Sequence, residues 1–253
     1  MSHFSPARRF DAVICDIDGC LAPESSAPFD LPSLAKIADH NRLAHELRDR
    51  PIVTVCSGRP EPFAEAMCRL IQNHSLPAIA ENGVWIYHPD RNVYDRDPAI
   101  TSDHLKAVAA AAAWIDRELG AQGVVMQPGK TCSISLYHHN TEFLKTLESP
   151  IRERFHREGW PLRVSMTWLY INCDLAHISK GTAIDRWTAM TGIPKGRLAG
   201  IGDTRSDIPI IERVAFFASP ANAVEEIRDR AALVSPSHEA KGVVEILSRF
   251  VGA

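Results

Sequence analysis

The feature that most constrains this chain is a set of short apolar segments, each followed directly by polar residues. In the first third, apolar segments 12–16, 51–56 and 77–81 alternate with helical patterns at 33–50 and 61–74. Short continuous apolar runs are typical of parallel strands that are buried on both faces. Their alternation with helices predicts a doubly wound α/β layer with a parallel sheet.

The pattern changes after Asn82-Gly83. A long helix is predicted at 102–119 and another at 141–157, and the strand-like segments are 131–138, 162–165 and 168–173. The α/β rhythm then resumes with helix 180–190, strands 198–202, 214–218 and 231–234, and helix 240–250; Asn222 and Glu225 are spaced as a capping box for a helix that runs to Arg230. We expect a core formed by 1–84 and 178–253, with 85–177 inserted as an α+β domain.

Composition narrows the function classes. Twenty-eight Lys and Arg against 31 Asp and Glu give a net charge of −3, which argues against a dedicated nucleic-acid binder. No apolar run is long enough to span a membrane, and the N-terminus lacks the pattern of a signal peptide. The six cysteines form no CxxC pair and are interpreted as buried thiols. We expect a cytoplasmic protein, monomeric or homodimeric, that contacts neither nucleic acid nor membrane.

Four groups of polar residues interrupt the apolar pattern, three of them at the carboxyl ends of predicted strands, where open α/β sheets bind ligands. The first is Asp16-Ile17-Asp18-Gly19-Cys20. Its two acids point the same way if the strand continues, and Gly19 permits a sharp turn. One acid can then act as a nucleophile or metal ligand and the other as an acid or base, although an isolated pattern of this kind is about as often a solvated turn.

The second group, Ser57-Gly58-Arg59, offers a hydroxyl and loop amides to an anion; Ser57 alone also suits a helix N-cap. The third is Lys180, at the start of a helix, where a cation is usually disfavoured.

The fourth group, after a predicted strand, contains Asp203 and Asp207, whose i, i+4 spacing suits a hard cation such as Mg²⁺. Taken together, the four groups supply what phosphoryl transfer needs: a carboxylate nucleophile, a second acid, phosphate donors, a cation and metal ligands.

These residues resemble the four motifs of the haloacid dehalogenase superfamily of phosphotransferases, with DIDGC, Ser57, Lys180 and GDTRSD in the corresponding places. The segments ENGVWIYH and SPANAVEEIRDRAALVSPSHEAKGVVEIL resemble its Cof-like, type IIB branch, which includes sucrose-phosphate, trehalose-phosphate and mannosyl-3-phosphoglycerate phosphatases. The resemblance implies a Rossmann-like core, with the insert as a C2-type cap.

The resemblance also implies roles for single residues. Asp16 is expected to attack phosphorus, and Asp18 to protonate the leaving oxygen and then activate water. Ser57 is expected to bind the phosphoryl group, and Lys180 to hold nucleophile and phosphate together. The implied Mg²⁺ ligands are Asp16, the carbonyl of Asp18, and Asp203, with Asp207 bound directly, bound through water, or steadying Lys180.

Two positions depart from the family pattern. Cys20 stands where Thr or Val is usual, and Ser206 replaces a common Asn. Neither change removes a charged group, so activity is still expected.

Other residues bear on the substrate. Gly129-Lys130-Thr131 looks like the end of a P-loop, but the glycine spacing is wrong and the next residues alternate like a strand. Lys130 is instead predicted, with Gly58 and Arg59, to bind substrate. Trp168, Tyr170 and Asn172 alternate onto one face of a strand, which suits a sugar site and equally a half-buried sheet.

The sequence therefore predicts a Mg²⁺-dependent phosphomonoester hydrolase of a small phosphorylated metabolite, a sugar phosphate or phosphorylated glycoside above all. The alternatives are a phosphomutase with the same nucleophile and a non-catalytic protein that binds a phosphorylated metabolite.

Overall fold

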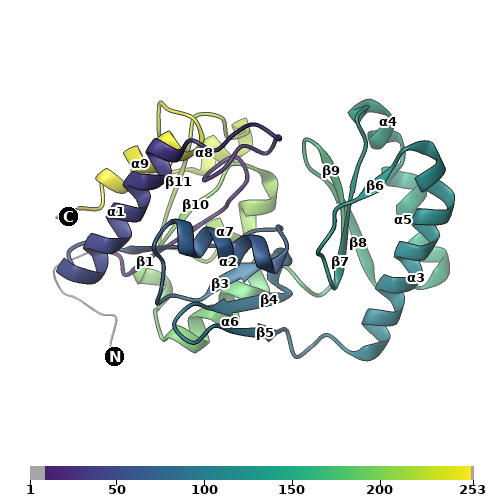
Figure 1. The fold of residues 1–253 in the computed structure, drawn as a ribbon, viewed down its shortest axis with the longest axis horizontal. Helices are drawn as coiled ribbons and strands as arrows, with labels where there is room; N and C mark the ends of the chain where they lie inside the picture. Colours follow the sequence, from purple (N-terminus) through teal and green to yellow (C-terminus); the bar gives the residue numbers. More distant parts are fainter. Residues whose placement is uncertain (1–8, 252–253) are drawn as a thin grey trace.

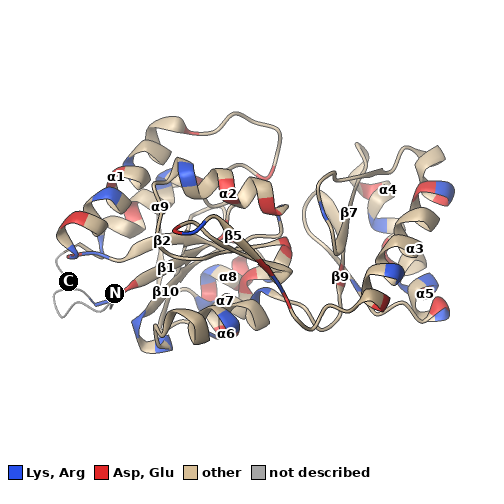
Figure 2. Ribbon diagram, turned by 60° about the horizontal axis from the view of Figure 1, so that its bottom comes forward, with Lys and Arg blue, Asp and Glu red and all other residues tan. Residues whose placement is uncertain are grey.

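The computed structural model describes residues 9–251, which form an α/β core and a smaller cap (Figure 1). The outer ends of the expected core domain, 1–8 and 252–253, lie outside the described residues. Figure 2 shows charges of both signs along the helices of core and cap.

The core is built on a parallel sheet whose strands are buried on both faces. Its strand order is β12-β11-β10-β1-β2. Residues of β1 alternate between two hydrophobic clusters: Val13 and Cys15 belong to one, Ala12 and Ile14 to the other. The strands are β1 (Ala12–Cys15), β2 (Ile52–Val55), β10 (Leu198–Ile201), β11 (Phe216–Ser219) and β12 (Leu233–Val234).

Helices cover both faces of this sheet, as the sequence predicts for a doubly wound fold. The first cluster packs one face against α1 (Leu31–Leu47), α2 (Glu61–Leu70) and α9 (Glu239–Ser248). The second packs the other face against α6 (Lys180–Thr191), α7 (Ile208–Ile211) and α8 (Glu225–Arg230). The predicted fold class is confirmed, and it brings the carboxyl ends of β1 and β10 side by side.

A small antiparallel sheet extends the core beside β2. It consists of β3 (Ala78–Ala80), β4 (Trp85–His88) and β5 (Val93–Arg96), and Ile79 bridges to Cys56 just after β2. The sequence analysis assigned 85–96 to the insert, but Ile86 and Tyr87 are buried in the core clusters. The first boundary of the cap therefore differs from the prediction, because this hairpin finds its apolar partners in the core.

The cap is a four-stranded antiparallel sheet backed by helices. Its strand order is β6-β7-β9-β8, and Ile134 and Ile171 pack with α3 (Ser102–Leu119) and α5 (Glu148–Glu158) on one face. In Figure 1 those helices lie on the side of the cap sheet away from the core. The strands are β6 (Val125–Met126), β7 (Ser133–Tyr137), β8 (Leu162–Met166) and β9 (Tyr170–Leu175). The other face of the sheet, which carries polar residues, is therefore turned toward the core.

Two details of the cap differ from the predictions. The single helix expected at 141–157 is divided into α4 (Thr141–Thr146) and α5, because Pro150 lacks an N–H and its ring clashes with the carbonyl one turn earlier. The last strand begins at Tyr170, so Trp168 lies in the turn before it, with 62% of its surface exposed.

All six cysteines are free thiols and buried, as predicted. Within residues 9–251, no helix is both long and apolar enough to cross a bilayer.

Candidate active site

The chain turns sharply where β1 ends, and this turn carries the two acids of the first motif. Gly19 has a φ of +73°, and a Cβ there would lie 1.9 Å from Oδ2 of Asp203. Only glycine fits both the conformation and this close approach. The turn therefore brings the end of β1 against the loop that follows β10, two segments far apart in the sequence.

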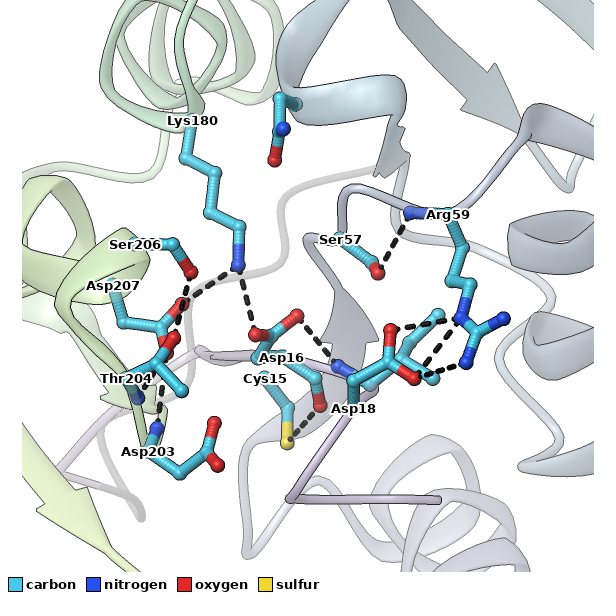
Figure 3. A network of polar contacts seen from close by, with 12 residues as sticks. Cys15, Asp16, Asp18, Ser57, Arg59, Lys180, Asp203, Thr204, Ser206 and Asp207 are labelled. Carbon is cyan, nitrogen blue, oxygen red and sulfur yellow. Dashed lines mark hydrogen bonds and ion pairs between the residues drawn. The ribbon is translucent and has the colours of Figure 1, made fainter. Parts of the chain in front are cut away.

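Lys180 lies between two buried carboxylates (Figure 3). Its Nζ is 2.9 Å from Oδ2 of Asp16 and 2.7 Å from Oδ1 of Asp207. Burial by itself would lower the pKa of Lys180, but the charges of the two carboxylates outweigh burial and hold this pKa well above its usual value. Lys180 is thus a permanent cation at the centre of the site.

Asp16 and Asp207 are fixed by further hydrogen bonds. Oδ1 of Asp16 accepts from the backbone N–H of Ile17 at 2.8 Å. Oδ2 of Asp207 accepts from the N–H groups of Asp203 and Thr204 at 3.0 and 3.1 Å. Both oxygens of Asp207 are therefore engaged, one with Lys180 and one with the loop after β10.

Asp203 is the least satisfied acid of the site. Its buried Oδ1 has no hydrogen-bond partner. Burial, followed by repulsion from Asp207 and Asp16, raises the pKa of Asp203 to about 9. Burial, followed by repulsion from Asp207, likewise raises the pKa of Asp16, although Lys180 opposes the rise.

This arrangement fits a hard cation. Asp16, Asp203 and Asp207 each offer an oxygen within 4.8 Å of the others. Carboxylate oxygens are the ligands that Mg²⁺ prefers, and a bound cation would oppose the burial and the repulsion that raise both pKa values. The unpartnered oxygen of Asp203 would gain a partner at the same time.

Two further residues of the site, Ser57 and Arg59, follow the end of β2. Ser57 is fully buried, and its Oγ accepts from the N–H of Arg59 at 3.1 Å. The Arg59 guanidinium binds Asp18: Nε lies 2.8 Å from Oδ2, and Nη2 lies 2.5 Å from Oδ1. Arg59 also stacks over the ring of Phe63, 5.0 Å from its centroid. Asp18 is therefore held at the mouth of the site by an arginine from the next strand.

The polar face of the cap closes the site. A cavity of about 70 Å³ is bounded by core residues that include Asp16, Asp18 and Lys180. Its walls from the cap are Gln127, Lys130, Ser135, Thr167, Tyr170 and Asn172. A larger groove of about 1170 Å³ adjoins it and shares Asn172 and Lys180. The chemical groups thus come from the core, and the cap supplies the facing wall.

Two adjacent core residues attach the base of the cap sheet. Glu81 accepts from the N–H groups of Thr131 and Cys132 at 2.9 and 2.7 Å, and from both hydroxyls of Thr131 and Ser133 at 3.0 Å. Asn82 donates to both oxygens of Asp174 at 3.2 Å. Because Ser133 pairs with Asp174, the two residues hold both central strands of the cap at one level.

The structure brings nearly all of the sequence-predicted site residues together. Around this one cavity lie Asp16, Asp18, Gly58, Arg59, Lys130 and Lys180. Asp203 and Asp207 lie beside Asp16, and Ser57 lies beneath the loop that carries Gly58. Tyr170 and Asn172 also line the cavity, whereas Trp168 lines only the outer groove. The two positions that depart from the family pattern lie as follows: Cys20 is buried, and the hydroxyl of Ser206 lies 2.9 Å from the hydroxyl of Thr204.

One residue of the site has a different role from the one that its sequence context predicts. Asn222 was predicted to cap a helix, but α8 begins at Glu225 and receives no side-chain cap. The Nδ2 of Asn222 instead donates to the carbonyl of Gly19 at 2.8 Å and lies 3.5 Å from Oδ2 of Asp203. The Oδ1 of Asn222 accepts from the N–H of Glu239. Its position just after β11, at the same sheet edge as the four motifs, was the available signal.

Sequence comparison places this geometry among known proteins. A profile of the haloacid dehalogenase-like hydrolases matches residues 125–247. A phosphoglycolate phosphatase of Archaeoglobus fulgidus is 28% identical over 95% of this chain and 96% of its own length. Another phosphoglycolate phosphatase, from Methanospirillum hungatei, is 26% identical over 94% of this chain and 95% of its own.

The fold is shared with solved structures at lower identity. The sucrose-phosphatase of Synechocystis, solved with sucrose and phosphate, superimposes with a TM-score of 0.66 at 18% identity, over 96% of this chain and 98% of that one. The likeness includes both the core and the cap.

Proposed function

We propose that the chain is a Cof-like haloacid dehalogenase-type phosphatase and that it hydrolyses a small phosphorylated metabolite with Mg²⁺ through an aspartyl-phosphate. One observation carries the proposal: a buried carboxylate, Asp16, lies 2.9 Å from a buried lysine and within 4.8 Å of two further acids. Such a set supports a nucleophile, a cation and metal ligands gathered around one buried point.

The ligands proposed for Mg²⁺ are Asp16, Asp203 and the carbonyl of Asp18. Oδ1 of Asp203 supports this assignment because it is buried without a partner. Both oxygens of Asp207 already accept hydrogen bonds, so its proposed role is to position Lys180 and the Asp203 loop. When bound, the cation neutralises charge on the phosphoryl oxygens.

In the first step, an oxygen of Asp16 attacks phosphorus, and the bond from phosphorus to the leaving oxygen breaks. Asp18 gives that oxygen a proton. Ser57 Oγ and the N–H groups of its loop donate to the phosphoryl oxygens, and Lys180 balances their charge. In the second step, Asp18 takes a proton from water, the water attacks phosphorus, and Asp16 is released with inorganic phosphate.

Two substrate classes deserve comparison. The sequence analysis favours a sugar phosphate, and the groove of about 1170 Å³ beside the site offers room for a sugar. The relatives named above are phosphoglycolate phosphatases, and the small cavity over Asp16 suits a two-carbon substrate. Both classes are phosphomonoesters and need the same chemistry.

The test is phosphate release from a panel of sugar phosphates, phosphoglycosides, phosphoglycolate and an aryl phosphate, with Mg²⁺ and with EDTA. We expect release that requires Mg²⁺ and is lost in Asp16→Asn. A ³²P-labelled substrate should leave label on the wild-type protein after an acid quench. Release that is undiminished by EDTA or by Asp16→Asn would refute the mechanism. Bisphosphate-dependent isomerisation of a sugar phosphate without net release would identify a phosphomutase instead.

A further inference from the structure

The active-site cavity contains three cations, and they differ in their partners. Lys180 binds Asp16 and Asp207, and Arg59 binds Asp18. Within residues 9–251, Lys130 forms no ion pair; its Nζ donates to the hydroxyl of Ser135. Lys130 is therefore a cap cation that lines the site without a counter-charge in the protein.

The two acids whose charges act most strongly on Lys130, Asp174 and Glu81, already have other partners. Asp174 accepts from Asn82 and lies 3.7 Å from Arg163, and Glu81 holds the residues that follow Lys130. Burial lowers the pKa of Lys130 and outweighs the attraction of these two acids. The attraction between an anion and a partly buried ammonium is stronger than that between an anion and an exposed lysine, because less water screens the two charges.

The position of Lys130 is fixed from both sides. Glu81 binds the backbone N–H groups of Thr131 and Cys132, directly after the lysine. On the other side, Gly129 has a φ of +86°, and a Cβ there would lie 3.4 Å from Pro60, next to Arg59. The loop is thus fastened to the core, and Lys130 occupies a prepared position rather than a free surface one.

The hydroxyl of Ser135 orients the ammonium in turn. It accepts from Lys130 and donates to Oδ1 of Asn172, which also lines the cavity. An ammonium has three N–H donors, and this series of hydrogen bonds uses one of them. The other two remain for a ligand.

Resting on the phosphatase function proposed above, we propose that Lys130 binds a carboxylate of the substrate, so that the enzyme selects short phosphorylated carboxylic acids. Lys180 and Mg²⁺ serve the phosphoryl group, which leaves Lys130 for a second anion. Lys130 and Asp16 line the same cavity of about 70 Å³, which favours a carboxylate that lies one or two carbons from the phosphoryl oxygen. The single positive charge of one lysine balances the single negative charge of a carboxylate.

The test compares phosphoglycolate with ethyl phosphate, which has the same length but an uncharged end. We expect wild-type kcat/KM to be at least about 30-fold higher for phosphoglycolate. Lys130→Met, which keeps the length of the side chain, should reduce that ratio to within about threefold of one, chiefly through KM for phosphoglycolate. Lys130→Arg should retain most of the preference, because the charge remains.

Lys106→Met is the matched control, since Lys106 is an exposed cap lysine on α3 that pairs with Asp103 at 2.8 Å. It should leave the ratio unchanged. Melting temperatures identify any variant that fails to fold, and binding of phosphoglycolate and of ethyl phosphate to Asp16→Asn, by calorimetry, provides a second measure of the preference.

A wild-type ratio near one, or an equal loss for both substrates in Lys130→Met, would overturn the inference while the phosphatase function stood. Absence of Mg²⁺-dependent release from every phosphomonoester tested would instead refute the proposed function and the inference with it.

Discussion

The two walls of the active-site cavity are built differently. On the core wall, both cations are paired with acids: Lys180 bridges Asp16 and Asp207, and Arg59 binds Asp18. On the cap wall, hydroxyl and amide groups surround Lys130, a cation without an ion pair in residues 9–251. On the core wall the buried Oδ1 of Asp203 is left for a cation, whereas on the cap wall the ammonium of Lys130 is left for an anion.

This difference separates chemistry from recognition. Fixed charges from several strand ends meet at Asp16 and require little reorganisation during phosphoryl transfer. A cap group acts on the part of the substrate that does not react, so it mainly affects binding. Changes on the core wall should therefore cost far more activity than the change at Lys130.

The largest expected effect is the loss of the proposed nucleophile. Asp16→Asn should lower kcat/KM by more than about 10⁴-fold, because the proposed covalent intermediate forms on the Asp16 carboxylate. Asp39→Asn, on the exposed face of α1, is the control and should leave the rate within about twofold. Steady-state phosphate release measures both. A residual rate within about tenfold of wild type would mean that the two walls do not differ as described.

Asp18→Asn should have the next largest effect, about 10²-fold with an alkyl phosphate, because the leaving alkoxide needs a proton. With p-nitrophenyl phosphate the loss in the first step should be smaller, since a nitrophenolate leaves without protonation. Single-turnover rates of dephosphorylation separate that step from the attack of water. Equal losses with both substrates would argue against Asp18 as the acid.

Asn222→Ala tests a residue that positions the core wall. Without its hydrogen bond to the Gly19 carbonyl, the first turn and Asp203 should lose their relative placement. The Mg²⁺ concentration for half-maximal activity should rise about fivefold, the equivalent of one hydrogen bond. Mn²⁺ binding followed by electron paramagnetic resonance gives a readout independent of turnover.

The control for Asn222→Ala is Asn140→Ala, which removes the N-cap of α4 in the cap. It should lower stability without changing the requirement for metal. The same metal requirement in Asn222→Ala and wild type would exclude the positioning role.

The smallest effect concerns the stability of the core. His40 is buried in α1, where its Nε2 lies 2.8 Å from the carbonyl of Pro51, and burial lowers its pKa to about 4. The unfolded chain, with the ordinary histidine pKa near 6.5, binds a proton first as the pH falls, so stability decreases between about pH 6.5 and pH 4. At pH 5.5 the loss from this residue is about 1 kcal/mol relative to pH 7.5.

His40→Gln should lack the part of the stability loss between pH 7.5 and pH 5.5 that comes from His40, whatever the stability of this variant at pH 7.5. Urea unfolding of wild type, His40→Gln and His139→Gln, an exposed cap control, at both pH values measures it. An unaltered pH dependence in His40→Gln would show that other groups dominate the acid response of the core.

The sequence predicts most of the core, because its signals are local. An apolar run followed by an acid, a serine or a Gly-Asp pair specifies both a buried strand and a polar strand end, and parallel strands bring such ends to one edge. The exceptions occur where a local signal had two uses. Asn222 has the spacing of a helix cap, but its amide binds the Gly19 carbonyl across the sheet edge. The hairpin of β4 and β5 follows the expected start of the insert, but its apolar side chains fit the core.

By itself, the sequence determined the doubly wound core, the residues that meet at its edge and the presence of an inserted cap. Only the tertiary structure decided which cations are already paired, because pairing depends on distances between segments far apart in the chain. Lys130 illustrates the difference. Its sequence context is a loop before a strand, but it has no ion pair within residues 9–251 because Asn82 and Arg163 engage Asp174, and the residues after Lys130 engage Glu81. The sequence gives the position of each charged residue along the chain, but tertiary packing determines which residue each charge pairs with.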